Sequence, residues 1–107
     1  MSVAISGATG FVGQAVLDSA NRQGIAIRAL TRRAQDSRGG VTWVEGALSD
    51  SASLDRLIEG AEPVVHIAGL TNAPDPKDFH QANVIGTRNL LRACQDAGVR
   101  RFVFVSS

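Results

Sequence analysis

The chain has 107 residues, a formal net charge of +1 at pH 7 and 44% hydrophobic residues. This length is enough for one domain, so residues 1–107 are expected to form a single unit with an ordinary globular composition. The near-neutral charge argues against nucleic acid or an anionic membrane surface as the main partner.

Cysteine content and hydropathy indicate the cellular setting. Cys94 is the only cysteine, which rules out a disulfide within the chain and favours a reducing compartment. We expect its side chain in the core. The N-terminal apolar stretch lacks a basic flank and is interrupted by glycines, unlike a signal peptide. No segment approaches the roughly 20 apolar residues of a membrane span. A soluble cytoplasmic protein without membrane contact is therefore expected.

The N-terminal part of the chain predicts a strand, a glycine-rich turn and a helix. Val3–Ile5 is a short apolar strand, and Phe11–Gln23 has the periodicity of a helix that ends at Gly24. The inward face of this helix is expected to consist of Val12, Val16, Leu17 and Ala20. Between strand and helix, glycine recurs at every third position, at Gly7, Gly10 and Gly13.

This turn has the features of a phosphate-binding site. Gly7 permits positive φ in a tight turn, Gly10 lets backbone amides approach a diphosphate, and Gly13 allows close packing of the helix. The helix that begins near Phe11 directs its free N–H groups and positive dipole end at the turn, which favours an anion. The competing interpretation is a glycine-rich turn without a ligand. Because a strand precedes the motif and a helix follows it, we predict that the pyrophosphate of a dinucleotide binds here.

The following elements continue the alternation. A second strand is predicted at Ile25–Leu30, followed by a polar loop over Thr31–Gly40 and a third strand at Val41–Glu45. A short helix is predicted over Ser51–Glu59, and Gly60 ends it.

A fourth strand is predicted at Pro63–Ile67, because this run is apolar apart from His66, as in strands covered on both faces. We interpret His66 as a strand residue with one satisfied ring nitrogen, and the alternative is an acid or base. A long helix begins at Pro76 and ends at Gly98, and Phe102–Val105 is a fifth strand. The inward stripe of the long helix is Phe79, Ala82, Gly86, Leu90, Ala93, Cys94 and Ala97. Helical crossovers between buried strands predict an α/β fold with a doubly wound parallel sheet in the order 3-2-1-4-5.

The sequence resembles the extended or atypical short-chain dehydrogenase/reductases, which include NAD(P)-dependent epimerases and dehydratases of nucleotide sugars. Four stretches carry the resemblance: residues 7–13 (GATGFVG), 64–69 (VVHIAG), 83–91 (NVIGTRNLL) and 101–107 (RFVFVSS). The first two glycines lie three positions apart, whereas they lie two apart in ordinary dinucleotide domains. The resemblance implies a Rossmann-type domain that is truncated before its later strands and substrate domain.

The resemblance also implies roles for individual residues. Contacts to the pyrophosphate would come from the turn, namely from Gly7, Thr9, Gly10, Phe11, Val12 and Gly13. Ala68 and Gly69 would run beside the ribose groups of the cofactor. Asn83 would help to hold a water chain behind the active site, and Ser107 would hydrogen-bond the reacting oxygen of the substrate. For Asn83, a purely structural amide on the buried helix face is the alternative. No metal site is predicted.

The residues after the second strand predict which nucleotide binds. Domains that prefer NAD place a carboxylate there to accept from the adenosine ribose hydroxyl, but this chain has Thr31, Arg32 and Arg33, with no acid before Asp36. A guanidinium binds a 2′-phosphate through two parallel N–H bonds. We therefore predict NADP(H) as the preferred cofactor, with Arg32 as the main contact supported by Thr31 and Arg33, and NAD(H) as the second choice. The alternative is a pair of solvated arginines.

Adenine recognition departs from the pattern of the family. Many members have an aspartate after the glycine that ends the third strand, but here Ala47 follows Gly46. The side chain of Ala47 cannot accept a hydrogen bond, so adenine is expected to rest against Leu48 and backbone atoms. Asp50 is expected to cap the following helix.

The proton-transfer residues of the family do not occur in this sequence. The chemistry requires a tyrosine and a lysine four residues later, on the helix after the fifth strand, and the chain has no tyrosine. We expect a truncated portion of a longer reductase or epimerase, and the alternative is a complete small protein that binds a nucleotide without turnover. The fifth strand is then an uncovered edge that invites self-association, so a homodimer is one expected assembly.

The expected function is that of the NADP(H)-binding portion of an oxidoreductase or epimerase, inactive on its own. The parent protein would act at a carbinol carbon of a nucleotide sugar or a related small molecule, its second partner beside the dinucleotide cofactor. The alternatives are a non-catalytic dinucleotide-sensing or interaction module and a structural accessory subunit.

Overall fold

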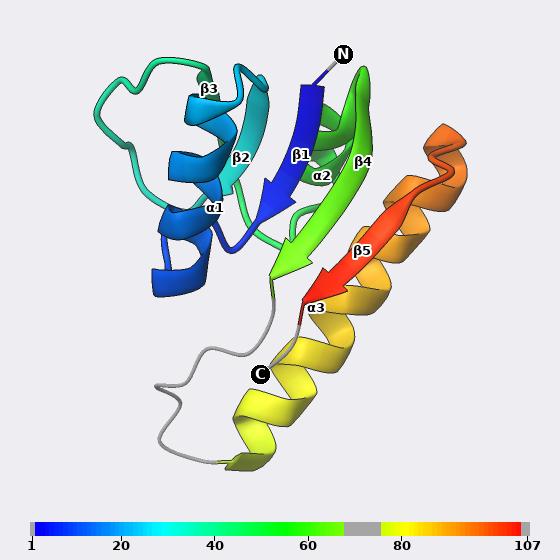
Figure 1. The fold of residues 1–107 in the computed structure, drawn as a ribbon. Coiled ribbons are helices and arrows are strands. Elements are labelled where there is room, and N and C mark those ends of the chain that lie inside the picture. The colour runs from blue at the N-terminus through cyan, green and yellow to red at the C-terminus, as the bar shows by residue number, and fades with distance from the viewer. Residues whose placement is uncertain (1, 68–75, 106–107) are drawn as a thin grey trace.

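The computed structural model describes residues 2–67 and 76–105, and their side chains except those of residues 76–82. Strands and helices follow one another along the chain in the predicted order (Figure 1). In chain order the elements are β1 (Ser2–Ser6), α1 (Phe11–Arg22), β2 (Ile27–Thr31), β3 (Val41–Glu45), α2 (Ser51–Ile58), β4 (Ala61–Ile67), α3 (Pro76–Ala97) and β5 (Phe102–Val105).

Element ends differ from the prediction by one or two residues. β2 begins at Ile27 rather than at Ile25, because the N–H of Ile25 still bonds the Ala20 carbonyl oxygen in the turn that closes α1 (2.9 Å). β4 begins two residues earlier than predicted, at Ala61. These shifts leave the number and type of the predicted elements unchanged.

The five strands form one sheet in the order β3-β2-β1-β4-β5, and all neighbouring strands are parallel. The predicted order is therefore confirmed. α1 lies on one face of the sheet and α2 on the other (Figure 1). Because Ile5 of β1 pairs with Ala29 of β2 and Val65 of β4, the carboxyl ends of these three strands meet at one edge.

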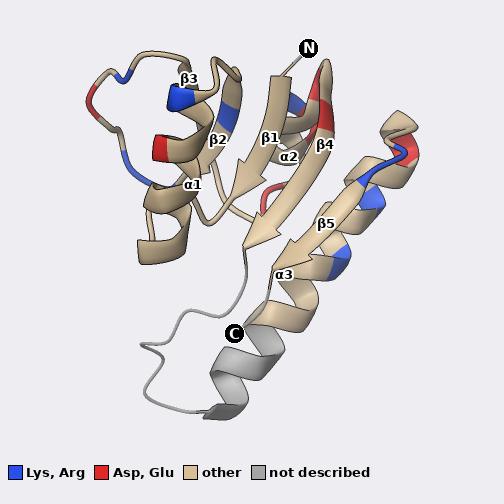
Figure 2. Cartoon of the chain, in the orientation of Figure 1, with Lys and Arg blue, Asp and Glu red and all other residues tan. Residues whose placement is uncertain are grey.

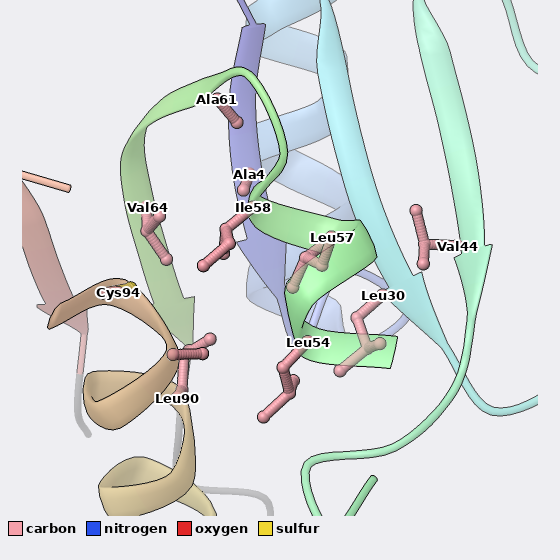
Figure 3. Close-up of a cluster of buried hydrophobic side chains, with 11 residues drawn as sticks. Ala4, Leu30, Val44, Leu54, Leu57, Ile58, Ala61, Val64, Leu90 and Cys94 are labelled. Carbon is pink, nitrogen blue, oxygen red and sulfur yellow. The ribbon is translucent and has the colours of Figure 1, made fainter. Parts of the chain in front are cut away.

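Two hydrophobic clusters hold the helices to the sheet. Alternate strand residues point to opposite faces, so Ala4 belongs to one cluster and Ile5 to the other. The cluster under α2 and α3 is drawn in Figure 3 and contains Ala4, Leu30, Val44, Leu54, Leu57, Ile58, Ala61, Val64, Leu90, Ala93 and Cys94. The cluster under α1 contains Ile5, Ala8, Leu17, Ala20, Ile27, Ala29 and Ile67. Burial raises the pKa of the Cys94 thiol, which suits a core side chain rather than a nucleophile.

Two predicted core positions are wrong among the residues whose side chains are described, and the predicted core positions Phe79 and Ala82 lie outside them. Val12 is 47% exposed, because Gly13 and not Val12 is the residue in the first turn of α1 that faces the glycine-rich turn before the helix. Ala97, at the end of α3, is exposed as well. The other predicted inward residues of α1 are buried or partly buried.

β5 forms one edge of the described sheet, and α3 lies beside it (Figure 1). Val103 and Phe104 of β5 are each about half exposed. Self-association through this edge stays a prediction. Among the described helices, none is long and apolar enough to cross a membrane.

Candidate functional site

The turn between β1 and α1 is built so that only glycine fits at two of its positions. Gly7 has a φ of +84°, and a Cβ there would lie 2.4 Å from the Ile67 carbonyl oxygen. A Cβ at Gly13 would lie 2.2 Å from the Gly7 carbonyl oxygen and 2.5 Å from the Cα of Ala8. The close partner of Gly13 is thus the backbone of the turn itself. The first turn of α1 therefore packs closely against the backbone of residues 7 and 8.

No side chain of the described residues caps the N-terminus of α1. Gly10 occupies the N-cap position in an extended conformation, and the first helical bond joins the N–H of Gln14 to the Gly10 carbonyl oxygen (2.9 Å). The N–H groups of residues 11–13 therefore have no partner within the helix. No acidic residue lies in the first turn to compete for them. An anion placed at this turn would gain both these donors and the positive end of the helix dipole.

A cleft of about 500 Å³ opens at this edge of the sheet. It lies between the glycine turn, the ends of β1, β2 and β4, the segment after β3, and α3. The cleft brings together seven of the predicted site residues, namely Gly7, Thr9, Gly10, Thr31, Arg32, Leu48 and Asn83. Ser6, His66, Gly86 and Asn89 also line it and were not predicted to contact the cofactor.

The remaining predicted site residues lie elsewhere. Phe11 is 91% exposed and lines a groove that shares Thr9 and Gly10 with the cleft. Val12, Gly13 and Arg33 do not line the cleft with their side chains or backbone. The predicted contacts at Ala68, Gly69 and Ser107 lie outside the described residues.

The segment after β2 is ordered by Thr31. The Thr31 side chain is buried, and its hydroxyl donates to the Arg33 carbonyl oxygen (2.7 Å) and accepts from Gln35 Nε2 (3.2 Å). Thr31 therefore shapes the turn in which Arg32 and Arg33 lie. Arg32 is exposed at the rim of the cleft.

Charges around the site favour a negatively charged ligand. Figure 2 shows basic stretches on both sides of one acidic stretch in the loop between β2 and β3, and no acidic residue in the first turn of α1. Arg38 of this loop pairs with Asp18 and donates to Gln14 Oε1 (3.0 Å), which fixes the loop against α1. No other ion pair occurs in the described part of the chain, so Arg32 and Arg33 are not neutralised there by a carboxylate.

The side chain of Ser53 on α2 holds the segment after β3. The Ser53 hydroxyl accepts from the N–H of Ala47 (3.2 Å) and lies 2.7 Å from the Asp50 carbonyl oxygen, to which it donates. Asp50 is the N-cap residue of α2, but its side chain makes no capping hydrogen bond, so the predicted side-chain cap is wrong. The hydroxyl of Ser53 ties down this turn instead.

α3 packs against the same segment. Asn89 Nδ2 donates to the Leu48 carbonyl oxygen (2.9 Å), and a Cβ at Gly86 would lie 2.9 Å from Leu48 Cδ1. The absence of a side chain at Gly86 thus lets α3 lie close to Leu48. Gly86 and Asn89 both lie in the stretch 83–91 that carries the family resemblance. This stretch was the only feature of the sequence that pointed to the contact.

His66 is more constrained than predicted. It is 2% exposed, and both ring nitrogens have partners, Ser6 Oγ at Nδ1 and Thr87 Oγ1 at Nε2 (3.0 Å). The expectation of one satisfied nitrogen is therefore wrong. Burial lowers the pKa of His66, which keeps the imidazole neutral near pH 7. Within the described residues, no group of three or more His, Cys, Asp or Glu side chains is placed to hold a metal ion.

Comparison with known proteins agrees with this architecture. Residues 3–107 match the model of the NAD dependent epimerase/dehydratase family. A ceramide reductase of Caulobacter vibrioides is 39% identical over 111 residues, which cover 98% of this chain and 34% of the relative. The chain thus spans about a third of the length of the curated relatives that it matches.

Solved structures show the same fold. A short-chain dehydrogenase/reductase superfamily protein from Agrobacterium tumefaciens with bound NAD superposes with a TM-score of 0.81 and 39% identity, covering 100% of this chain and 33% of that one. MoeE5 in complex with UDP-glucuronic acid and NAD superposes with a TM-score of 0.84 and 29% identity, covering 100% of this chain and 37% of that one. A parallel sheet in the order β3-β2-β1-β4-β5, a glycine turn at an uncapped helix and a family match over nearly all residues lead to one conclusion. The chain belongs to the NAD dependent epimerase/dehydratase family.

Proposed function

We propose that the cleft binds a nicotinamide dinucleotide and prefers NADP(H) to NAD(H). The observation that carries the proposal is the uncapped N-terminus of α1, held against the Gly7 turn at the edge of a 500 Å³ cleft. The free N–H groups of residues 11–13 would donate to the pyrophosphate, as expected for a βαβ dinucleotide site. The solved relatives that hold NAD support the class of ligand.

The preference for NADP(H) rests on Arg32. Its side chain is exposed at the rim of the cleft, directly after the buried Thr31, and no described carboxylate pairs with it. The 2′-phosphate of the adenosine ribose would accept two parallel N–H bonds from this guanidinium. Arg33 would add positive charge from the same turn, and Thr31 would hold the turn in place through its bond to the Arg33 carbonyl oxygen.

Adenine would lie against Leu48. This side chain lines the cleft, and its carbonyl oxygen is fixed by Asn89 of α3. Ala47 provides only backbone groups for hydrogen bonding to the adenine edge. The binding of adenine would therefore depend mainly on apolar contact.

The test is a fluorescence titration of the unaltered protein and of Arg32→Ala with NADPH and NADH. Loss of a charge-assisted contact costs about 1.5–3 kcal/mol, so the affinity for NADPH should fall roughly ten- to hundredfold. The affinity for NADH should change by less than about twofold. Arg22→Ala, at the opposite end of α1 from Gly10, is the matched control. An unchanged ratio of the two affinities in Arg32→Ala would remove Arg32 from the site.

We further propose that the chain is the cofactor-binding portion of an enzyme that acts at a carbinol carbon of a nucleotide sugar or a related small molecule. MoeE5, which superposes over the whole chain, binds UDP-glucuronic acid as well as NAD, and this supports the substrate class. The absence of tyrosine from the sequence supports binding without hydride transfer by the chain alone. It equally supports the second candidate, a non-catalytic dinucleotide-sensing module. A turnover assay with UDP-sugars and bound cofactor should show no reaction, and measurable turnover would overturn the proposed inactivity.

A further inference from the structure

His66 is the centre of a buried polar contact that joins three elements. Its Nδ1 bonds the Oγ of Ser6, the last residue of β1, and its Nε2 lies 3.0 Å from the Oγ1 of Thr87 on α3. The exposed fractions of Ser6 and His66 are only 1% and 2%. The imidazole of β4 thus satisfies both its nitrogens with hydroxyls from two other elements.

The same contact lies at the wall of the cleft. Ser6 directly precedes the Gly7 turn, and both Ser6 and His66 line the cleft. Thr87 lies one helical turn after Asn83, which lines the cleft from α3. The ring centroids of Phe102 and Phe104 lie 6.4 and 5.6 Å from that of the imidazole. A shift of the imidazole would therefore move either the glycine turn or α3.

We propose that His66 is a positioning residue of the cofactor cleft, and this rests on the proposed binding of a nicotinamide dinucleotide. Its neutral imidazole ties Ser6 to Thr87 and thereby sets the distance between the Gly7 turn and the Asn83 turn of α3. The dinucleotide would have to fit between these two walls. His66 acts through Ser6 and Thr87, and no direct bond to the cofactor is required.

A neutral imidazole determines which groups donate and which accept in this contact. One ring nitrogen donates and the other accepts, so one hydroxyl must donate to the ring while the other accepts from it. Removing either hydroxyl leaves a buried nitrogen without a partner, which favours a rearrangement that admits water or shifts the attached element. Burial lowers the pKa of the ring, which favours its neutral form.

A second contact determines how α3 would respond. Asn89 holds the Leu48 carbonyl oxygen at 2.9 Å, less than one helical turn beyond Thr87. With this end of α3 attached, loss of the Thr87 bond would let the helix pivot rather than move away as a whole. The change would be largest at Asn83, on the far side of Thr87 from Asn89.

The test compares three variants by NADPH titration and urea unfolding. Thr87→Val keeps the size and branching of the side chain but removes the hydroxyl, and Thr87→Ser restores the hydroxyl. Ile58→Val is the control for stability, because Ile58 lies in the core cluster and does not line the cleft. We expect Thr87→Val to weaken NADPH binding about three- to tenfold and Thr87→Ser to stay within about twofold of the unaltered protein. Ile58→Val should bind NADPH like the unaltered protein although its unfolding midpoint is lower.

The outcomes separate this proposal from the proposed function. Saturable binding that Thr87→Val leaves unchanged would overturn the positioning role, and so would equal weakening by Ile58→Val. Absence of saturable binding in the unaltered protein would instead overturn the proposed function. Ser6→Ala breaks the same contact from β1 and should weaken binding to a similar extent. It serves as the test if Thr87→Val does not fold.

Discussion

The C-terminus of α2 and the N-terminus of α1 lie at opposite edges of the sheet and differ in whether side chains bond their unpaired backbone groups. At the end of α2, Arg28 of β2 donates to the carbonyl oxygens of Leu57 (Nε, 3.1 Å) and Arg56. These are among the carbonyls that an α-helix leaves unpaired at its C-terminus. At the start of α1, no side chain in the described part of the chain caps the helix. One end is closed by the chain itself, whereas the other is left open toward a cleft.

The difference distinguishes stability from function. Arg28 places a positive charge at the negative end of a helix dipole, which stabilises the fold and leaves nothing for a ligand to bind. The N-terminus of α1 forgoes a Ser, Thr, Asp or Asn cap, which would contribute roughly 0.5–2 kcal/mol. Its donors are free for an anion instead. Changes at the two ends should therefore affect different measurements.

The largest effect is expected from Gly13→Ala. The new Cβ would meet backbone atoms of Gly7 and Ala8 at 2.2–2.6 Å, so α1 must move away from the turn. We expect NADPH affinity to fall more than about 100-fold, which corresponds to roughly 2.7 kcal/mol, together with a loss of stability of about 1–3 kcal/mol from overpacking.

The matched control for this substitution is Gly39→Ala. No atom lies within 4 Å of a Cβ at Gly39, and its φ is not positive. This variant should bind NADPH like the unaltered protein in the same titration. Equal affinities of Gly13→Ala and Gly39→Ala would show that the close packing of α1 on the turn is not needed for binding.

A charge at the open helix end should separate affinity from stability. Phe11 is 91% exposed, so Phe11→Glu places a carboxylate in the first turn of α1 without removing a core contact. Relative to the neutral Phe11→Gln, it should stabilise the fold by about 0.3–1 kcal/mol through the helix dipole. It should nevertheless weaken NADPH binding about tenfold, because the carboxylate repels the pyrophosphate. Titration at 0.05 and 0.5 M salt should show this difference shrinking with salt. Equal affinity of the two variants at low salt would argue against an anion at this helix end.

Removing the side-chain donor at the C-terminus of α2 should lower stability and leave NADPH affinity unchanged. Arg28→Ala leaves the Leu57 and Arg56 carbonyl oxygens without their side-chain donor. We expect the free energy of unfolding in urea to fall by about 1–2 kcal/mol, with NADPH affinity unchanged. A parallel fall in affinity would show that the two helix ends are not independent.

The smallest effect is expected from pH. Burial lowers the pKa of His66 in the folded chain, so below about pH 6.5 the unfolded chain takes up a proton that the folded chain resists. Stability contributed by the neutral ring is present above this pH and is lost as pH falls, by at most about 1.4 kcal/mol per pH unit. Urea unfolding at pH 7.5 and 5.5 should show a larger decrease for the unaltered protein than for His66→Gln. The same decrease in both would assign the acid sensitivity to other groups.

Sequence patterns predict the features of this fold that depend on neighbouring residues. The apolar runs determine all five strands, and the glycine spacing places the turn where Gly7 adopts positive φ. The side-chain contacts of Arg28, His66 and Asn89 join residues 21 to 60 positions apart. Such contacts depend on how the folded elements pack together, so no local sequence pattern predicts them. The exposure of Val12 was missed for a related reason, since periodicity alone does not show that Gly13 is the residue drawn against the turn.

The most direct measurement is a two-dimensional amide NMR titration of the labelled chain with NADPH. If the uncapped end of α1 donates to the pyrophosphate, the amide resonances of Phe11, Val12 and Gly13 should shift and saturate together with those of the Gly7 turn. The amides of Gly60 and Gly98, which line a pocket away from the cleft, should not move. Saturable binding that leaves the resonances of residues 7–13 in place would contradict the account.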